Sequence, residues 1–374
     1  MHYYIIKKLF YPDREESILK KVLLFPIWII SFIFGLIVRL RKFLYNVGVF
    51  SKKSPPCDII SVGNLTIGGG GKTSAVIYLA EMLMDQGLLV GILSRGYKGK
   101  NKGLPMIVSL GEKTLLEQEI AGDEPYLMAE KLKGVSVFIG RDRFKSVSFA
   151  LKISPFDCFI MDDGFSHLRI SRSLDILVIN GRNGFGNGYL LPRGPLREPL
   201  KELKRVSVFI IINNKGSSLN LENLIKCYNS KAGIFYANYI PQGFRRVIND
   251  ENIPLYKIKK DGIISFAGIA HPDSLLETMK EMGVESKAFI PFPDHYKYKI
   301  KDLEKILLLA KNKKVKYIGT TEKDAVRIKP LIQDSEYVWV KLCIKFFISD
   351  KDEEWRLKRH ILGSFKRGMP DYAK

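Results

Sequence analysis

The stretch DIISVGNLTIGGGGKTSAVIYLAEMLMDQ at residues 58–86 places a glycine loop between a β-rich run and a segment of helical spacing. DIISV at residues 58–62 predicts a strand, and residues 74–86 predict a helix. Between them, TIGGGGKT at Thr66–Thr73 matches the end of the phosphate-loop template G-x4-G-K-[ST], with Thr66 in place of the first glycine. A strand before the loop and a helix after it form the context that this motif requires. A flexible glycine turn is therefore the weaker interpretation.

Each residue type in this loop suits contact with the phosphates of a nucleotide. Consecutive glycines let backbone N–H groups wrap an anion, and the start of the following helix favours negative charge. Lys72 is expected to reach the β- and γ-phosphates, and the Thr73 hydroxyl is expected to ligate Mg²⁺. The residues predicted to bind the nucleotide are Thr66, Gly68, Gly69, Gly70, Gly71, Lys72 and Thr73.

Two acidic clusters are candidates to work with the loop. Residues 156–161 predict a strand that leads into Asp162 and Asp163, and carboxylates at such a strand end can hold Mg²⁺ or its waters. Asp123 and Glu124 follow a polar loop and precede a helical run. Taken alone, Asp123 is better explained as a helix cap.

Isolated histidines and cysteines do not by themselves indicate a site here. His167 lies shortly after the acidic pair, and His295 ends the string FPDH at residues 292–295. A lone histidine is more often structural than catalytic. The four cysteines lie far apart without a CxxC pair, which argues against a zinc site.

Apolar β-rich runs alternate with helical spacing on both sides of a loop-rich stretch at residues 180–199. This alternation predicts an α/β fold with a mostly parallel, doubly wound sheet of the phosphate-loop NTPase type. New β-rich runs after residue 205 predict a second, smaller α/β domain. The predicted organisation is a membrane-associated helical segment at residues 1–50, the phosphate-loop core at 51–204, the second lobe at 205–350 and a basic, partly helical tail at 351–374.

An apolar run, VLLFPIWIISFIFGLIV at Val22–Val38, has basic residues on both flanks. Its 17 residues are the lower limit for a spanning helix. A helix that spans the membrane would either place the nucleotide loop outside the cell or carry several lysines across. Positive charge on both flanks favours a helix dipped into one leaflet, kinked or interrupted at Pro26. A spanning helix and a helix buried in the protein remain as alternatives.

The composition is that of a globular and strongly basic protein. The chain has 374 residues, 46% of them hydrophobic and 26% charged, with a formal net charge of +21. Such a charge attracts an anionic membrane, phosphorylated substrates or nucleic acid. No nucleic-acid-binding module is recognisable, so we expect no nucleic-acid partner.

Eight motifs in order resemble those of the tetraacyldisaccharide 4′-kinase family. They are GNLTIGGGGKT, SRGYKGK, GDEPYLMA, DDGFSHLRISRSLDI, GNGYLLPRGPLREP, FAGIAHPDS, FPDHY and TEKDAVR. The resemblance extends over residues of about 15 to 345. It implies transfer of the γ-phosphate of ATP to the 4′-hydroxyl of a tetraacylated glucosamine disaccharide 1-phosphate in lipid A synthesis. It also implies a lipid-linked substrate and a place at the cytoplasmic face of the bacterial inner membrane, peripheral or monotopic.

The resemblance also implies roles for residues of this chain. The catalytic residues would be Asp123 paired with His295, together with Lys72. The Mg²⁺ ligands carried over are Thr73, Glu124 and Asp163, with Asp162 close by. Groups that contact phosphates or the substrate would be Arg143, His167 and Arg197. The chain departs from the family pattern at the GGGG of the loop, at Ser166 and at Arg193, and none of these departures removes a reacting group.

The alternative function is a membrane-associated phosphate-loop switch or partition-type ATPase. Partition ATPases carry a second lysine early in the loop, at the position of Ile67 here, which argues against them. A GTPase would show N/T-K-x-D, and neither NKGS at residues 214–217 nor TEKD at residues 321–324 has that pattern. The kinase is therefore the favoured prediction.

Overall fold

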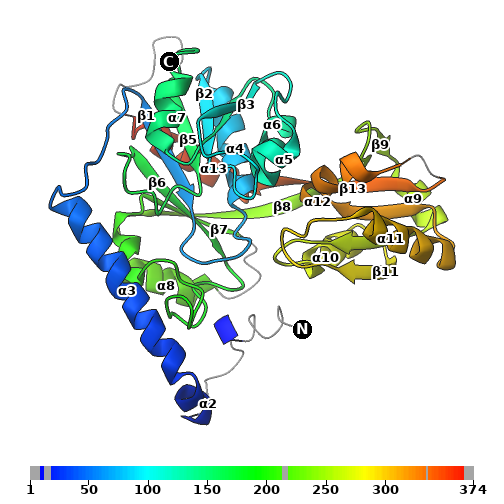
Figure 1. Ribbon diagram of the computed structural model, residues 1–374, viewed down its shortest axis with the longest axis horizontal. Coiled ribbons are helices and arrows are strands. Elements are labelled where there is room, and N and C mark those ends of the chain that lie inside the picture. Colours follow the sequence, from blue (N-terminus) through cyan, green and yellow to red (C-terminus); the bar gives the residue numbers. More distant parts are fainter. Residues whose placement is uncertain (1–8, 12–17, 213–217, 334–335, 366–374) are drawn as a thin grey trace.

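The computed structural model describes residues 9–11, 18–212, 218–333 and 336–365. Its strands form one 13-stranded sheet in the order β11-β10-β12-β13-β8-β7-β6-β1-β5-β2-β4-β3, with β9 paired to β8 (Figure 1). Most neighbouring strands are parallel, and β3–β4, β8–β9 and β8–β13 are antiparallel. The predicted α/β class is confirmed, and the sheet is mixed and continuous from one lobe to the other.

The phosphate-loop lobe contains the elements from β1 to α8. They are β1 (Asp58–Gly63), α4 (Lys72–Met84), β2 (Val90–Ser94), β3 (Met106–Leu110), α5 (Gln118–Ala121), α6 (Asp123–Lys131), β4 (Ser136–Ile139), α7 (Arg143–Ala150), β5 (Cys158–Asp162), β6 (Leu174–Asn180), the 3-10 helix η1 (Leu200–Arg205), β7 (Val208–Ile212) and α8 (Ser218–Tyr228).

Helices cover both faces of the sheet in this lobe because adjacent strand residues point to opposite sides. On β1, Ile60 packs in the cluster that includes α4 and α6, whereas Ile59 packs with α7. On β6 and β7, Leu177 and Phe209 pack with η1 and α8. Because these strands are buried on both faces, their sequences read as continuous apolar runs, which the sequence analysis recognised as strands.

The second lobe contains the elements from β9 to η2. They are β9 (Asn252–Ile253), α9 (Leu255–Asp261), β10 (Ile263–Ala267), α10 (Asp273–Glu281), β11 (Ser286–Pro291), α11 (Ile300–Asn312), β12 (Tyr317–Thr321), α12 (Glu322–Ile328) and the 3-10 helix η2 (Lys329–Leu331). One face of its strands packs with α9 and α10, and the other with α11 and α12.

Two long antiparallel strands, β8 (Gly233–Arg246) and β13 (Val338–Ile348), join the lobes and run from one into the other (Figure 1). Strand β7 pairs in parallel with β6, inside the phosphate-loop lobe, although the sequence assigned the run at residues 206–212 to the second lobe.

After β13 the chain returns to the phosphate-loop lobe. Helix α13 (Lys351–Leu362) buries Leu357 and Ile361 in the core around α4, so part of the predicted basic tail is helical and packs on the phosphate-loop lobe.

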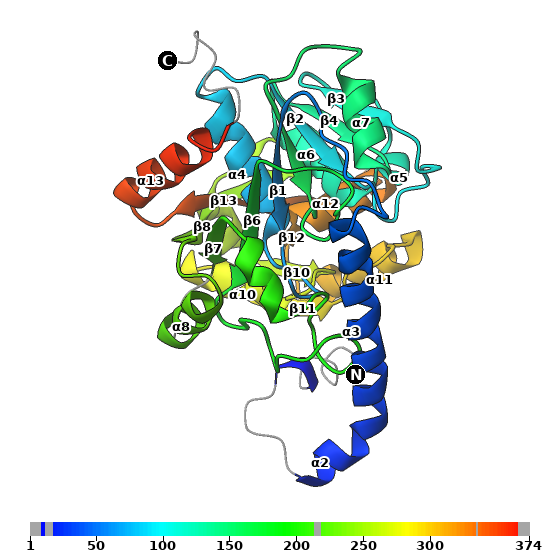
Figure 2. The same ribbon diagram turned by 90° about the vertical axis from the view of Figure 1, so that its left-hand side faces the viewer.

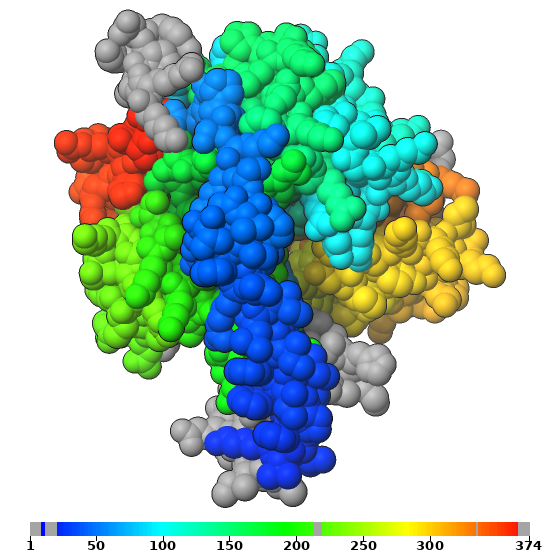
Figure 3. Space-filling view, turned by 60° about the vertical axis from the view of Figure 1, so that its left-hand side comes forward, coloured from blue at the N-terminus to red at the C-terminus, as the bar shows by residue number. Residues whose placement is uncertain are grey.

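Two helices, α2 (Ile18–Leu23) and α3 (Phe25–Asn46), precede the sheet. Pro26 lies at the start of α3, where its missing N–H costs no helical hydrogen bond, so the apolar run is interrupted at this point as expected. Figures 2 and 3 show α3 lying along the outside of the phosphate-loop lobe and extending beyond it.

The most buried residues of helix α3 are small, and most of its large apolar side chains are exposed. Ser31 and Gly35 are buried, and the Ser31 hydroxyl donates a hydrogen bond to the Leu190 carbonyl at 2.6 Å. Most of the large apolar side chains are exposed, including Ile30 at 55% and Ile37 at 60%, so the alternative of a helix buried in the protein is wrong. In the described part of the chain, no helix is both long enough and apolar enough to cross a membrane.

Candidate active site

The phosphate loop connects β1 to α4, and its last glycine is required by the backbone. Gly71 is the N-cap residue of α4 and has a φ of 74°, in the left-handed region that suits glycine. A Cβ atom at this position would lie 2.5 Å from Ile212 Cδ1 and 2.6 Å from the Tyr239 hydroxyl. Both conformation and space therefore require glycine here. Lys72 is the first residue of the helix, which begins before the predicted start at Ser74.

Lys72 is held among polar groups from three segments of the phosphate-loop lobe. Its ammonium donates to Asn64 Oδ1 at 3.0 Å and lies 3.4 Å from Asp163 Oδ1. Arg197 donates to both carboxylate oxygens of Asp163, at 2.8 and 2.9 Å, and to the Asn64 carbonyl at 2.8 Å. Arg197 was predicted to contact phosphates or the substrate, and it lies beside the nucleotide loop.

Asp162 and Asp163 at the end of β5 have opposite electrostatic environments. Asp162 is buried and accepts a hydrogen bond from the Ser94 hydroxyl at 3.0 Å. Burial and the neighbouring Glu124 and Asp163 carboxylates raise the pKa of Asp162 to about 7. Burial also works to raise the pKa of Asp163, but Lys72 and Arg197 bring that pKa below its usual range.

The residues predicted to hold Mg²⁺ fit a hard cation. Thr73, Glu124, Asp162 and Asp163 offer only oxygen donors, which Mg²⁺ prefers. Asp162 Oδ1 is buried and has no hydrogen-bond partner among the described residues. In the same described part of the chain, no three His, Cys, Asp or Glu side chains group closely enough to hold a metal by themselves. In nucleotide sites Mg²⁺ commonly takes one or two protein carboxylates and keeps phosphate and water oxygens for the rest of its shell.

Asp123 and His295 lie together where the two lobes meet. The N-cap position of α6 is taken by Gly122, so Asp123 is the first helical residue and is not the cap. His295 Nδ1 lies 3.3 Å from Asp123 Oδ2. His295 has a φ of 58°, in the left-handed region, and its backbone N–H donates to the Gly268 carbonyl at 3.1 Å. A non-glycine residue held in this conformation is often part of a functional site.

Arg327, which the sequence analysis did not single out, completes this group from α12. Its Nε donates to Asp123 Oδ2 at 2.7 Å, and its Nη2 lies 3.3 Å from His295 Nδ1. Burial works to raise the pKa of Asp123, but the His295 hydrogen bond and the Arg327 charge bring that pKa below its usual range. Asp123 is therefore ionised at neutral pH.

A second buried carboxylate, Asp324, holds Arg327 in place. Asp324 Oδ1 accepts from Arg327 Nη1 at 2.8 Å and from the Tyr298 hydroxyl at 3.0 Å. Arg327 Nη1 also donates to the Gly268 carbonyl at 2.9 Å. These bonds fix the guanidinium and the turn that carries His295 relative to each other. The string TEKDAVR carries both charged residues, and their spacing of three on a short helix is the signal that could have identified the pair.

Glu124 is also paired across the lobes. Lys323 of α12 donates to Glu124 Oε1 at 2.6 Å. The charge of Lys323 lowers the pKa of Glu124 to about 2, against the effect of burial. Near the nucleotide loop the lobes also approach each other, because a Cβ atom on Gly69 would lie 3.0 Å from Ala270 Cβ.

Arg143, which is buried, and His167, which is half-buried, lie next to the β5 carboxylates. Arg143 donates to the Gly140 carbonyl at 2.6 Å and to the Asp162 carbonyl at 3.4 Å. Burial and the Arg143 charge lower the pKa of His167 to about 4, so its imidazole is neutral at pH 7. Arg143 Nε and His167 Nε2 are buried without a hydrogen-bond partner in the part of the chain that the structure describes.

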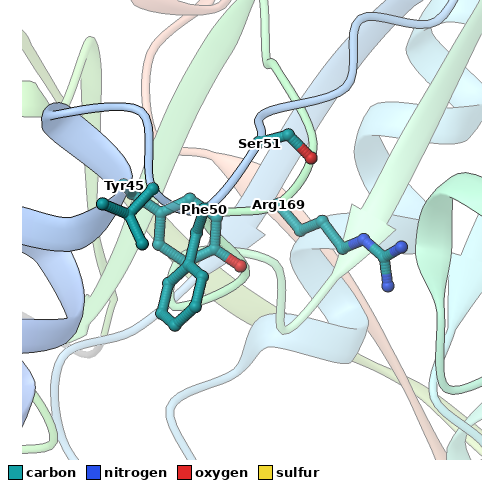
Figure 4. A pocket seen from close by; sticks show the side chains of 5 residues that line it. Tyr45, Phe50, Ser51 and Arg169 are labelled. Carbon is teal, nitrogen blue, oxygen red and sulfur yellow. The ribbon is translucent and has the colours of Figure 1, made fainter.

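A cavity of about 320 Å³ lies at the C-terminal end of α3 (Figure 4). It is lined by Tyr45, Val49, Phe50, Ser51 and Arg169, and none of these is a predicted site residue. Arg169 pairs with Asp142 at 2.7 Å. The predicted chemistry instead gathers at the phosphate loop and at the junction of the lobes.

The chain is similar to known proteins in sequence and in structure. The family described as Tetraacyldisaccharide-1-P 4′-kinase matches residues 23–362. A tetraacyldisaccharide 4′-kinase from Halothermothrix orenii is 35% identical over 327 residues, covering 83% of this chain and 85% of the relative. One from Desulfatibacillum aliphaticivorans is 37% identical over 322 residues, covering 85% and 86%.

A crystal structure has the same fold. It is described as the "apo" form of LpxK from Aquifex aeolicus in complex with ATP, and it superposes with a TM-score of 0.72 at 32% identity. The match covers 92% of this chain and 99% of that one. The predicted kinase function is confirmed over the alternative of a switch or partition ATPase. The chain belongs to the Tetraacyldisaccharide-1-P 4′-kinase family.

Proposed function

We propose that this lipid A kinase carries out phosphoryl transfer at the junction of its lobes, from ATP on the phosphate loop to a hydroxyl held by Asp123. The acceptor is the 4′-hydroxyl of a tetraacylated glucosamine disaccharide 1-phosphate. The observation that carries the assignment is the Asp123 carboxylate of one lobe, which lies beside His295 and Arg327 of the other.

Asp123 acts mainly by orienting the acceptor hydroxyl. Phosphoryl transfer passes through a loose transition state, in which positioning and charge stabilisation matter more than early proton removal. A carboxylate with a low pKa suits this task because it is ionised at neutral pH. His295 and Arg327 fix its orientation, and the proton of the hydroxyl passes to this carboxylate as the new bond forms.

Lys72 stabilises the charge that develops on the β- and γ-phosphates. Thr73, Glu124, Asp162 and Asp163 would hold Mg²⁺, which neutralises phosphate charge when it is bound. Arg197 keeps Asp163 ionised and pointed toward Lys72. Arg143 and His167 are assigned contacts with polar groups of the sugar or its phosphate, a role that the family resemblance implies.

Transfer of label from [γ-³²P]ATP tests this function directly. Purified protein is offered the tetraacyl disaccharide 1-phosphate, phosphatidylglycerol and diacylglycerol in separate reactions, and lipid products are separated by chromatography. We expect label on the disaccharide, at the 4′ position, and on neither other lipid. Release of phosphate to water without lipid labelling would instead indicate a switch-type ATPase.

Helix α3 is proposed to lie in one leaflet at the cytoplasmic face of the bacterial inner membrane. Its exposed apolar residues face away from the lobe, and an exposed apolar surface of this size usually marks a membrane or protein contact. Arg39, Arg41 and Lys42 at its C-terminal part supply positive charge for anionic lipids, although Lys42 also pairs with Glu202. The lipid substrate can then keep its acyl chains in the leaflet.

Charged substitutions on the outer side of α3 should release the protein from membranes. The double variant Ile30→Glu/Ile37→Glu is expected to lower cosedimentation with phosphatidylglycerol-containing vesicles at least about tenfold, because each buried Ile contributes roughly 1.5–3 kcal/mol. Leu308→Glu is the matched control, since Leu308 is 59% exposed on α11 of the second lobe. Unchanged sedimentation of the double variant would contradict leaflet insertion of α3.

A further inference from the structure

The turn at residues 163–167, directly after β5, carries Asp163 and His167, which are both proposed site residues. It packs closely on the end of β1. A Cβ atom on Gly63 would lie 2.5 Å from Phe165 Cβ, and the Phe165 side chain is fully buried. The turn therefore lies against the strand that leads into the phosphate loop.

Three consecutive carbonyl groups of this turn accept hydrogen bonds from arginines of three different segments. The pairs are the Phe165 carbonyl with Arg205 Nη2 at 2.8 Å, the Ser166 carbonyl with Arg41 Nη2 at 3.3 Å and the His167 carbonyl with Arg172 Nη1 at 2.9 Å. Hydrogen bonds from an ionised donor are stronger than those between neutral groups. The main chain of the turn is therefore held in place by charged side chains.

Arg205, on η1, bonds to more than the turn. Its guanidinium also donates to Glu198 Oε2 at 2.8 Å, to Glu202 Oε2 at 3.1 Å and to Asp175 Oδ2 at 3.4 Å. These three carboxylates are buried, and the Arg205 Cζ atom lies 3.4 Å from the centroid of the Phe165 ring. Buried ion pairs are screened little by salt, so the guanidinium is firmly fixed behind the turn.

Two of the Arg205 bonds flank the ion pair between Asp163 and Arg197. Phe165 follows Asp163 by two residues, and Glu198 follows Arg197 directly. One guanidinium thus bonds both chain segments that carry the pair, and it sets their separation. Asp163 Oδ1 also lies 3.4 Å from the Lys72 ammonium. The position of the turn therefore decides where the Asp163 carboxylate stands beside the phosphate loop.

We propose that Arg205 is a positioning residue for phosphoryl transfer, which holds the turn at residues 163–167 so that Asp163 stands next to Lys72. Arg205 acts through the main chain of the turn and is not itself a catalytic residue. Contacts that orient a metal-binding carboxylate are typically worth about 10- to 100-fold in metal affinity or activity. The proposal rests on the proposed role of Asp163 as a Mg²⁺ ligand and does not depend on the identity of the acceptor.

The full-length Arg205→Lys variant tests the proposal. It keeps a positive charge for the buried carboxylates but lacks the planar fork of donors that reaches the Phe165 carbonyl as well. We expect the Mg²⁺ concentration for half-maximal rate to rise about 10-fold and kcat at saturating Mg²⁺ to fall by a similar factor. Lys204→Ala, an exposed neighbour on η1, is the control and should keep the wild-type values.

Two measurements do not depend on activity. Amide hydrogen exchange of the free protein, followed by mass spectrometry, should be about fivefold faster at residues 163–167 in Arg205→Lys, as the loss of one hydrogen bond predicts, and unchanged in α7. The Kd of a non-hydrolysable ATP analogue at varied Mg²⁺ should show the same shift in Mg²⁺ dependence as the rate. Unchanged exchange of the turn would overturn the proposal, because Arg205 would then not hold it.

A double variant shows whether the effect passes through Asp163. If it does, Asp163→Ala/Arg205→Lys is no slower than Asp163→Ala alone. A further loss equal to the full Arg205→Lys factor would show that Arg205 acts elsewhere and would overturn the proposal. Arg172→Lys loosens the same turn at the His167 carbonyl and should shift the Mg²⁺ dependence in the same direction, which keeps the test open if Arg205→Lys does not fold.

Stability and function are separated by the Mg²⁺ dependence. A lower Tm of Arg205→Lys with wild-type Mg²⁺ dependence of both rate and analogue binding would assign Arg205 to stability alone and overturn the proposal. A lack of lipid phosphorylation by wild type would instead refute the proposed function. The exchange and analogue measurements would then still decide whether Arg205 positions the turn.

Discussion

Replacing Asp123 by alanine is expected to lower kcat by about 10²–10⁴-fold, the range for loss of a positioned general base. The KM for ATP should change little, because the carboxylate contacts groups of the second lobe and is not assigned to the triphosphate. The measurement is kcat with saturating ATP and disaccharide. Wild-type kcat in this variant would exclude Asp123 from the reaction.

The contact between Asp123 and His295 leads to a more specific expectation. If His295 acts by orienting the carboxylate, His295→Ala lowers kcat in the same direction, and the double variant loses little more than the single ones, because residues that act as a unit are not additive. A double-variant loss equal to the product of the single losses would mean that the two residues act independently.

Glu124→Ala is the matched comparison, one residue along α6. Glu124 is a proposed Mg²⁺ ligand, so the rate of the Glu124→Ala variant should depend more steeply on Mg²⁺ concentration than the wild-type rate. The Asp123 and His295 variants should keep the wild-type dependence. Its partner Lys323 keeps a charge in the junction, so thermal unfolding of all three variants is needed to separate catalytic from structural loss.

The residues that the sequence predicts well are those whose neighbours in the chain define their role. The phosphate loop has its strand, glycines, lysine and threonine within one short stretch, so local rules predict both its structure and its ligand. Asp162 and Asp163 follow a buried strand in the same way. The sequence pairs Asp123 with His295 only through the family resemblance, because the number of residues between them holds no information about their distance in the fold.

Arg327 shows where such reasoning ends. It lies 204 positions from Asp123 in the chain, and its contact depends on how β8 and β13 set one lobe against the other. Local hydrophobic periodicity predicts helices and strands, but it does not predict which strands pair or which lobes touch. The same reason explains β7, whose apolar run predicts a strand but cannot tell which lobe it joins.

Helix α3 shows a different limit. The apolar run ends at Val38 because Arg39 follows it, yet the helix continues to Asn46. A hydropathy window stops at a charged residue, whereas a helix needs only continuing backbone bonds and partners for its charges. Lys42 has such a partner in Glu202, at 2.7 Å, and Arg41 donates to the Ser166 carbonyl at 3.3 Å.

Replacing Lys72 by alanine is expected to lower kcat/KM by at least ~100-fold, the loss typical of removing one preorganised charge or donor at the reacting group. Lys133→Ala is the control, since among the described residues its ammonium donates only to the Glu112 carbonyl on the same lobe. Both variants are assayed for lipid phosphorylation with saturating disaccharide and varied ATP.

The fold should survive the loss of Lys72, and this makes the experiment decisive. Asp163 keeps its two hydrogen bonds from Arg197, and the Asn64 carbonyl keeps its bond from the same guanidinium, so Asp163 is still paired with a cation. We therefore expect Tm to change by only a few degrees while kcat/KM falls. Lys72→Met, which keeps the length of the side chain but not its charge, should be as impaired as Lys72→Ala, because the charge and not the packing is what the transferring phosphate requires. Near-normal activity of the methionine variant would show that the lysine charge has no part in catalysis.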